Sequence, residues 1–136
     1  MERLDGHEPV VLVAEDEPLV RMLAVEALQD AGFRVLEAHN GEVAFGLIRD
    51  GQSIDILITD VKMPGRTGYE LAEAALGLRP DIKILLVTGY AQDPLPRKFA
   101  EAGIQLLFKP FDLDTFIAIA KQLLEAKRQE HATRKQ

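Results

Sequence analysis

Five side chains that phosphate chemistry can use occur at the ends of hydrophobic runs in this sequence. They lie in the segments VLVAEDE, ILITDVKMPG, LLVTGY and LLFKPF, and they are Glu15, Asp16, Asp60, Thr88 and Lys109. If the four runs are parallel strands, their carboxyl ends lie at one edge of a sheet, and these side chains can converge there. Each segment alone is ordinary, but the four in this order favour a shared site.

Glu15, Asp16 and Asp60 would bring three carboxylates into one small cleft. Like charges this close repel strongly unless a cation or a proton intervenes. Oxygen ligands favour magnesium, which takes one or two protein carboxylates and shares its other positions with water and phosphate. No histidine or cysteine lies near these residues in the sequence to favour zinc. The structural alternative is that the segment after Ala14 merely caps a helix and that Asp60 caps a turn.

Lys109 and Thr88 would supply an ammonium and a hydroxyl, which a phosphoryl group on Asp60 would need. In phosphoryl transfer, protein groups mostly position the reactants and neutralise charge on the equatorial oxygens. A carboxylate can itself be the nucleophile and give an aspartyl phosphate. A solvated lysine and a threonine suited to a strand are the structural alternatives for these two residues. Their coincidence with the acid cluster favours the chemical interpretation.

The elements that must hold these residues alternate between strands and helices. Apolar runs of strand length occur at Val10–Ala14, Val35–Leu36, Ile54–Thr59, Ile82–Val87 and Ile104–Phe108. Segments with helical periodicity separate them, in apolar stripes that include Leu23, Val43, Leu78 and Leu113. This alternation predicts an α/β fold, a flavodoxin-like doubly wound sheet of five parallel strands in the order 2-1-3-4-5, with helices on both faces.

Two of the expected helices have informative ends. Pro94 and Pro96 precede the fourth helix, where proline is tolerated in the first turn, and Gly103 follows it closely. We therefore expect this helix to be short and mobile. Asp112 precedes the last helix and is placed to cap it.

Length and composition indicate one globular domain. The chain has 136 residues, of which 47% are hydrophobic and 28% charged, which suffices for one core. We expect an N-terminal extension over residues 1–8, a domain over residues 9–126 and a polar, basic tail over residues 127–136. No apolar run could span a bilayer and no signal-peptide core is present, so we expect a cytoplasmic protein without a membrane partner.

Charge disfavours nucleic-acid binding, and cysteine content excludes sites that depend on thiols. The net charge of −6 disfavours nucleic acid as a partner. Residues 121–136 contain five basic residues and only two acidic ones. We interpret this segment as a solvated helix end rather than as a docking site for an acidic partner. Because the chain has no cysteine, it has no disulfides, thiolate metal ligands or thiol nucleophile.

Taken together, these motifs resemble a response-regulator receiver domain of bacterial two-component signalling. The resemblance covers residues 9–126 and rests on the acid pair after the first strand, Asp-x-x-Met-Pro-Gly after the third, Thr-Gly after the fourth and Lys-Pro-Phe after the fifth. It implies that Asp60 accepts phosphate from a kinase histidine. It also implies a Mg²⁺ ion, or Mn²⁺ in its place, held by Asp16, Asp60 and the backbone carbonyl of Lys62, with Glu15 acting through water.

The resemblance assigns roles to the remaining site residues. Lys109 would pair with the acceptor or its phosphate, and the Thr88 hydroxyl would move toward the phosphoryl group and reposition the loop and helix that follow. The Lys109–Pro110 peptide is expected to be cis. Lys62 and Tyr90 lie two residues beyond the acceptor and the threonine, where they would border the attacking water and tune dephosphorylation.

Two positions depart from the family pattern. Glu15 stands where aspartate is commoner, a change that a water-mediated contact tolerates. Leu106 stands three residues before the lysine, where Tyr or Phe is usual, so the usual coupling of the threonine to an aromatic ring is absent. An aromatic follows the threonine instead, as in a subfamily of stand-alone receivers with Thr-Gly-Tyr, often linked to atypical histidine kinases. We hypothesise that Tyr90 and the fourth helix replace the usual relay; the alternative is that Tyr90 is an ordinary loop aromatic.

The resemblance implies a phospho-acceptor signalling domain, not an enzyme, which assists only its own phosphorylation and dephosphorylation. Because no output domain is evident after residue 128, we expect a single-domain response regulator. It would signal by phosphorylation-dependent conformational change and protein–protein interaction, or act as a phosphate sink in a phosphorelay. The expected partners are a sensor histidine kinase or histidine phosphotransfer protein and an unknown downstream protein, and weak homodimerisation is left open.

Three rival functions fit less well. A phosphatase of the haloacid dehalogenase type would carry its nucleophile in Asp-x-Asp after the first strand and would need a cap, whereas Asp60 follows the third strand. Flavin binding would need a Ser/Thr/Gly phosphate loop where this chain has Glu-Asp-Glu. A receiver-like scaffold that never turns over is disfavoured by the intact Asp60, Thr88 and Lys109.

Overall fold

The computed structural model describes residues 8–89 and 95–134, along which strands and helices alternate. The strands are β1 (Val10–Ala14), β2 (Arg34–Ala38), β3 (Ile56–Asp60), β4 (Lys83–Thr88) and β5 (Gln105–Phe108). The helices are α1 (Pro18–Asp30), α2 (Gly41–Arg49), α3 (Gly68–Leu78), α4 (Arg97–Glu101) and α5 (Leu113–Arg134). In this described part of the chain, no helix combines the length and the apolar character needed to cross a membrane.

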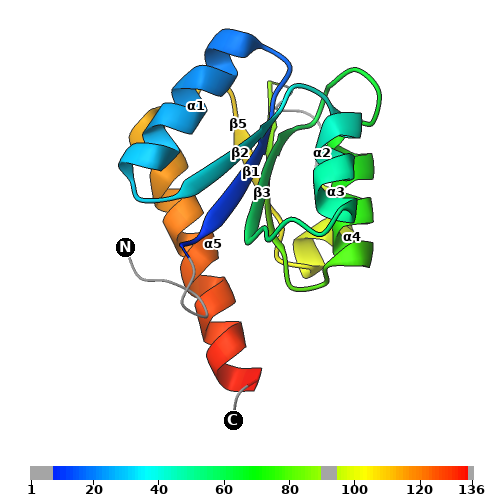
Figure 1. Ribbon diagram of the computed structural model, residues 1–136, viewed down its shortest axis with the longest axis vertical. Coiled ribbons are helices and arrows are strands. Elements are labelled where there is room, and N and C mark those ends of the chain that lie inside the picture. The colour runs from blue at the N-terminus through cyan, green and yellow to red at the C-terminus, as the bar shows by residue number, and fades with distance from the viewer. Residues whose placement is uncertain (1–7, 90–94, 135–136) are drawn as a thin grey trace.

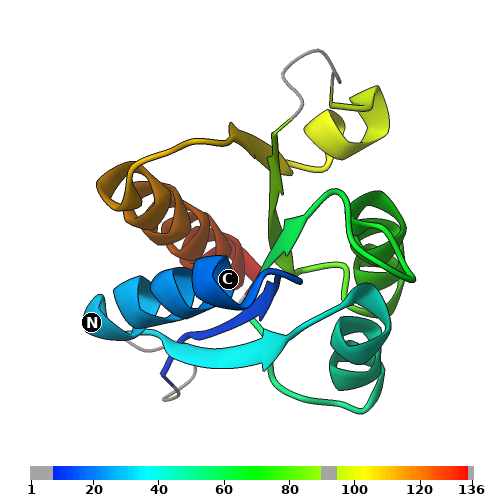
Figure 2. The same ribbon diagram turned by 90° about the horizontal axis from the view of Figure 1, so that it is seen from above.

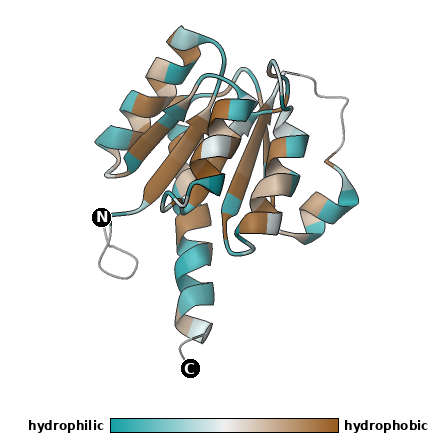
Figure 3. Ribbon diagram, turned by 45° about the vertical axis from the view of Figure 1, so that its right-hand side comes forward, coloured by the Kyte–Doolittle hydropathy of each residue, from teal (hydrophilic) through white to brown (hydrophobic). Residues whose placement is uncertain are grey.

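The five strands form one parallel sheet in the order β2-β1-β3-β4-β5, as predicted. Helices α2, α3 and α4 cover one face, and α1 and α5 cover the other (Figures 1 and 2). Side chains of β1 and β3 alternate between two apolar clusters, with Leu12 and Leu57 in one and Val11 and Ile56 in the other. Every residue of these two strands is buried, which explains their nearly unbroken apolar sequence (Figure 3).

The helical stripes have the predicted period, but four of their members do not face the core. Leu23, Val43, Leu78 and Leu113 are between 38% and 50% exposed. In α1 the buried residues are Leu28, which belongs to the predicted stripe, and Val25, which does not. Which side of a helix is buried depends on how it packs on the sheet, and a broad apolar stripe does not fix its exact centre.

The length of α4 and the start of α5 agree with the sequence, whereas the end of α5 does not. Helix α4 is short, as predicted, and covers only Arg97–Glu101. The Asp112 carboxylate accepts a hydrogen bond of 2.7 Å from the Thr115 amide and so caps α5. Helix α5 continues to Arg134, and the domain boundary expected at residue 126 therefore lies inside this helix.

The C-terminal half of α5 extends past the sheet (Figures 1 and 3) and is held by charged contacts. Lys127 Nζ lies 3.0 Å from Asp55 Oδ1, and both side chains are nearly buried, at 12% and 13% exposed. The other oxygen of Asp55 accepts a hydrogen bond of 2.8 Å from the Val10 amide. Lys83 at the start of β4 also pairs with Glu130. These contacts join the amino ends of the strands to the last turns of α5.

Candidate functional site

The carboxyl ends of the strands place the predicted residues at one edge of the sheet. Asp60 and Thr88 are the last residues of β3 and β4, and Asp60 pairs in register with Val87. Glu15 directly follows β1. Lys109 directly follows β5, where its amide donates a hydrogen bond of 2.8 Å to the Thr88 carbonyl. Glu15, Asp60 and Thr88 are buried.

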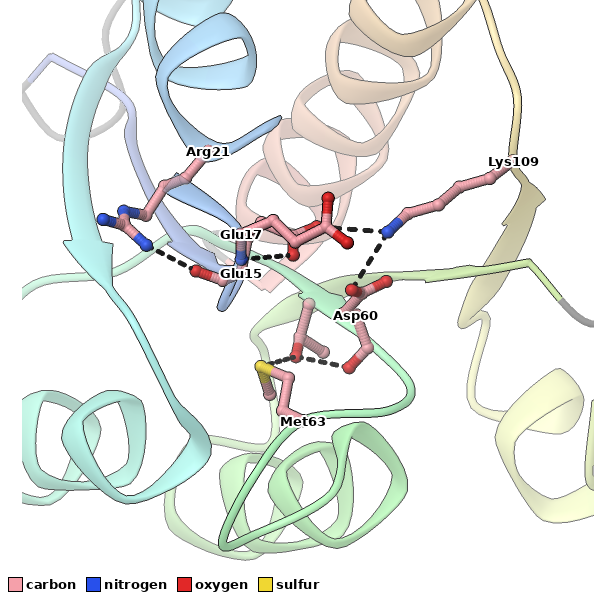
Figure 4. Close-up of polar contacts among 7 residues, drawn as sticks. Glu15, Glu17, Arg21, Asp60, Met63 and Lys109 are labelled. Carbon is pink, nitrogen blue, oxygen red and sulfur yellow. Dashed lines mark hydrogen bonds and ion pairs between the residues drawn. The ribbon is translucent and has the colours of Figure 1, made fainter. Parts of the chain in front are cut away.

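Glu15 and Asp60 both contact the Lys109 ammonium (Figure 4). Its Nζ lies 3.0 Å from Asp60 Oδ2 and 3.3 Å from Glu15 Oε1. Glu15, Asp16 and Asp60 each contribute one carboxylate oxygen to a group whose members lie within 4.8 Å of one another. One amine and three acids thus meet at the edge of the sheet that the sequence predicts.

The other predicted residues take different positions. Lys62 is an exposed residue of the loop after β3. Leu106 lies in β5, opposite Leu86 of β4, and packs against the apolar cluster under α2, α3 and α4. The Lys109–Pro110 peptide bond is cis. Tyr90 lies outside the described residues, so its roles in switching and dephosphorylation stay predictions.

Burial changes the proton affinity of the site. Loss of water raises the pKa of the Glu15 carboxyl to about 7, opposed by the Glu17 amide and Lys109. Burial likewise raises the pKa of Asp60, against the lowering effect of Lys109. Burial alone would lower the pKa of Lys109, but its contacts with Asp60 and Glu15 outweigh burial and the pKa rises. Two buried carboxylates therefore share one ammonium.

An apolar wall behind the acids accounts for this loss of water. A small cavity of about 20 Å³ lies there, and its apolar lining consists of Val13, Ala14, Val20, Ala24, Ile58, Val87, Phe111 and Phe116. The rings of Phe111 and Phe116 stack at a centroid distance of 5.4 Å. Glu15, Asp60 and Lys109 line the same cavity with their polar groups, so their charges lie against hydrocarbon on one side.

Two polar contacts of the site were not predicted from the sequence (Figure 4). Arg21 Nη1 donates a hydrogen bond of 2.7 Å to the Glu15 carbonyl. The Thr59 hydroxyl donates one of 2.9 Å to the Asp60 carbonyl. A lone arginine in the apolar second turn of α1 was an available signal for the first contact. The sequence holds no signal for the second, because a threonine in a strand needs no further explanation.

The donor set suits a hard divalent cation. All of its ligand atoms are carboxylate oxygens, and no histidine or cysteine joins the group in the part of the chain that the structure describes. Such oxygens are the ligands that Mg²⁺ prefers. The excess of acids over the single Lys109 ammonium leaves negative charge that such an ion would neutralise.

A model of the response regulator receiver domain matches residues 11–121, nearly the whole of the described fold. The chain belongs to this family. Receiver domains are the signalling domains of response regulators in two-component systems, and this class is the one that the motifs predict. The Thr-Gly-Tyr subfamily stays a prediction.

Relatives of this receiver domain occur both as separate proteins and as parts of larger ones. It is 37% identical over 118 residues to the response regulator receiver protein CpdR of Brucella abortus, covering 85% of this chain and 98% of CpdR. It is 40% identical over 124 residues to the sensor kinase CckA of the same organism, covering 90% of this chain but 13% of the kinase. The solved structure of the response regulator TrrA of Thermotoga maritima, in complex with Mg²⁺ and BeF, has a TM-score of 0.76 and 33% identity, covering 85% of this chain and 98% of TrrA.

The raised pKa of Glu15 predicts that the metal-free receiver domain loses stability as the pH rises. Between the ordinary value of 4.5 and about 7, the folded state keeps a proton that the unfolded state releases, so stability is highest at the acidic end of this window. We expect the free energy of unfolding in EDTA to be about 2 kcal/mol lower at about pH 7.5 than at about pH 5.5. Urea unfolding at the two pH values measures this difference.

The Glu15→Gln variant is the control for this prediction. It should show a smaller change between the two pH values, because it cannot ionise at this position and only Asp60, whose pKa burial also raises, remains. Saturating Mg²⁺ should also remove or reverse the slope in the wild-type protein, since the ion stabilises the ionised acids. The same slope in Glu15→Gln as in the wild-type protein would assign the effect to other groups.

Proposed function

We propose that this receiver domain is a single-domain response regulator whose Asp60 accepts a phosphoryl group. The observation that supports this most directly is the 3.0 Å contact between Lys109 Nζ and Asp60 Oδ2 inside a cluster of three carboxylates. A fixed ammonium beside a nucleophilic carboxylate, with a cation-binding acid cluster next to both, provides the charge neutralisation on which phosphoryl transfer depends.

The donor we propose is the phosphohistidine of a sensor histidine kinase or of a histidine phosphotransfer protein. A carboxylate oxygen of Asp60 attacks phosphorus, and a P–O bond forms as the P–N bond breaks. The leaving imidazole takes the bonding electron pair and, if it is not already protonated, a proton from solvent. Lys109 neutralises charge on the transferred oxygens, and the Thr88 hydroxyl donates a hydrogen bond to one of them.

The metal we propose is Mg²⁺, with Mn²⁺ as an alternative. Asp16, Asp60 and the Lys62 carbonyl would hold it, and the bound ion supplies positive charge for the phosphate oxygens. The complex of TrrA with Mg²⁺ and BeF supports this proposal. Glu15 would act through water, since its two carboxylate oxygens are already in contact with Lys109 and with the Glu17 amide, at 3.3 and 3.0 Å.

Output follows from a change of shape in this proposal. Thr88 would reposition the segment between β4 and α4 and so create or hide a surface for a downstream protein, while Leu106 supplies no aromatic ring for the usual relay. The match to nearly the full length of CpdR supports a regulator of one domain. A phosphate sink in a phosphorelay would use the same acceptor site without the downstream protein.

Intact mass spectrometry tests the acceptor role. Incubation with acetyl phosphate or phosphoramidate and Mg²⁺ should add the mass of one phosphoryl group, because both small donors present the same reactive phosphorus. The adduct should be absent in EDTA and in Asp60→Asn. The matched control Asp30→Asn, at an exposed aspartate in the last turn of α1, should be labelled like the wild-type protein. An adduct that persists in Asp60→Asn would refute the proposal.

A further inference from the structure

The Asp16 carboxylate depends on its backbone for its position. Within residues 8–89 and 95–134, this carboxylate makes no hydrogen bond or ion pair, whereas Lys109 and the Glu17 amide fix that of Glu15. Asp16 nevertheless lies in the group of acids within 4.8 Å of one another. Repulsion among three like charges favours a loop that turns Asp16 away into solvent. Some contact of the backbone must oppose this movement.

Arg21 supplies that contact (Figure 4). Its Nη1 donates a charge-assisted hydrogen bond of 2.7 Å to the Glu15 carbonyl, which belongs to the peptide unit joining Glu15 to Asp16. On the other side, the Glu15 amide donates to the Ala38 carbonyl at 3.1 Å. At the start of α1, the Glu17 amide donates to Glu15 Oε2 at 3.0 Å, which restrains the Glu15 side chain, and the Glu17 side chain makes no capping bond. Arg21 is thus the side chain that contacts the peptide unit itself.

The guanidinium of Arg21 is itself held in place. Its Nε lies 3.3 Å from Glu37 Oε1 on the neighbouring strand β2, and the Arg21 side chain is only 19% exposed. Arg21 therefore links α1, the loop after β1 and the edge strand. A guanidinium can make both contacts at once, with nitrogens that point in different fixed directions, whereas a lysine ammonium is a single point.

We propose that Arg21 is a positioning residue for the metal site, which keeps the peptide between Glu15 and Asp16 oriented so that the Asp16 carboxylate stays beside Asp60. This inference rests on the proposed function, since it concerns how the same acids hold a divalent cation. It predicts that removal of Arg21 weakens cation binding, which is opposite to the effect expected from charge alone. By charge alone, removing an arginine near an acidic site strengthens cation binding, whereas loss of a positioning residue weakens it.

Calorimetric titration with Mg²⁺ alone tests the proposal on the full chain. We expect Arg21→Met to raise the Kd for Mg²⁺ about tenfold, the lower end of what loss of an outer-shell partner costs. Arg21→Lys should raise it less, because it keeps the charge but makes one contact. Urea unfolding in EDTA reports any general loss of stability, which does not by itself change the Kd of protein that remains folded. If Arg21→Met does not fold, the Kd of Arg21→Lys for Mg²⁺ tests the proposal.

Two matched controls isolate the carbonyl contact. Arg49→Met removes the same charge from an exposed arginine that pairs with Asp50. Glu37→Gln removes the charge of the ion pair with Arg21, keeps an amide oxygen that can accept a hydrogen bond from Nε, and leaves the bond to the Glu15 carbonyl. Both should keep the Kd within about twofold of the wild-type value, since surface pairs contribute little.

The outcomes separate this inference from the function on which it rests. Weaker binding in both Arg21 variants, with normal binding in Arg49→Met and Glu37→Gln, supports the positioning role. A Kd for Arg21→Met that equals or falls below the wild-type value overturns the role and leaves the metal site intact. Failure of the wild-type protein to bind Mg²⁺ overturns both, and it is recognised because the loss is common to all variants.

Discussion

A Lys109→Met variant should form the aspartyl phosphate about a hundredfold more slowly than the wild-type protein at saturating Mg²⁺. Lys109 contacts both Asp60 and Glu15, at 3.0 and 3.3 Å, and so neutralises charge on the carboxylate that we propose as the acceptor. Removal of one preorganised group that stabilises developing charge typically costs on the order of 10²- to 10³-fold in rate. The affinity for Mg²⁺ should rise in the same variant, because the ion no longer competes with an ammonium for the acids.

Time courses of intact mass with acetyl phosphate measure the rate, and calorimetric titration measures the affinity. Lys98→Met is a matched control, since Lys98 is an exposed lysine of α4 that pairs with Glu73 at 3.2 Å. It should leave rate and affinity unchanged. If rate and affinity fall together in Lys109→Met, the lysine acts by arranging the acids rather than by neutralising the phosphoryl group.

A Gly68→Ala variant should lose about 3 kcal/mol of unfolding free energy, toward the upper end of what overpacking costs. Gly68 begins α3 and lies against the backbone of Asp60. A Cβ built on it would lie 2.2 Å from the Asp60 carbonyl oxygen and 2.8 Å from the Val61 Cα. Both neighbours are backbone atoms, so no side-chain rotation can relieve the clash. The strain would also displace Asp60, and Mg²⁺ binding should weaken.

Gly77→Ala in the same helix provides the opposite expectation. Gly77 is exposed, and a Cβ there would meet no heavy atom within 4 Å. This substitution should therefore stabilise the protein by about 0.5 kcal/mol, since alanine loses less conformational freedom in a helix than glycine does. Urea unfolding in EDTA measures both variants. Equal effects at the two positions would show that contact with Asp60 does not determine the result.

The sequence locates the site well because polar residues interrupt apolar runs at the strand ends. The runs predicted to end at Thr59 and Val87 each continue for one residue in the structure, so Asp60 and Thr88 are inside β3 and β4. Hydrogen bonding of the backbone does not depend on side-chain polarity, and it continues where the apolar pattern stops. The predicted strand order is confirmed, since crossover rules leave few alternatives for five alternating units.

Contacts between distant segments were harder to predict. No local pattern shows that Arg21 meets the Glu15 carbonyl, because this contact needs the relative placement of α1 and the loop after β1. The exposure of Leu23 and Leu113 is another example. Periodicity predicts which side of a helix is apolar, but it does not predict where the sheet that covers this side lies. The pairing of Lys127 is a third, because the basic composition of residues 121–136 indicates a solvated helix end, whereas Lys127 is nearly buried against Asp55.

The two halves of α5 should respond to different solution conditions. At 22 residues the helix is about 33 Å long, roughly twice the length of the strands beneath it. Phe116, Ala120 and Leu123 hold the first half by apolar burial, on which ionic strength has little influence. The second half depends on the pairs of Lys127 with Asp55 and of Glu130 with Lys83, at the amino ends of the strands. Salt screens the pair of the half-exposed Glu130 far more than the nearly buried pair of Lys127. Concentrated salt should therefore loosen the far end of α5 while the end beside the acid cluster stays docked.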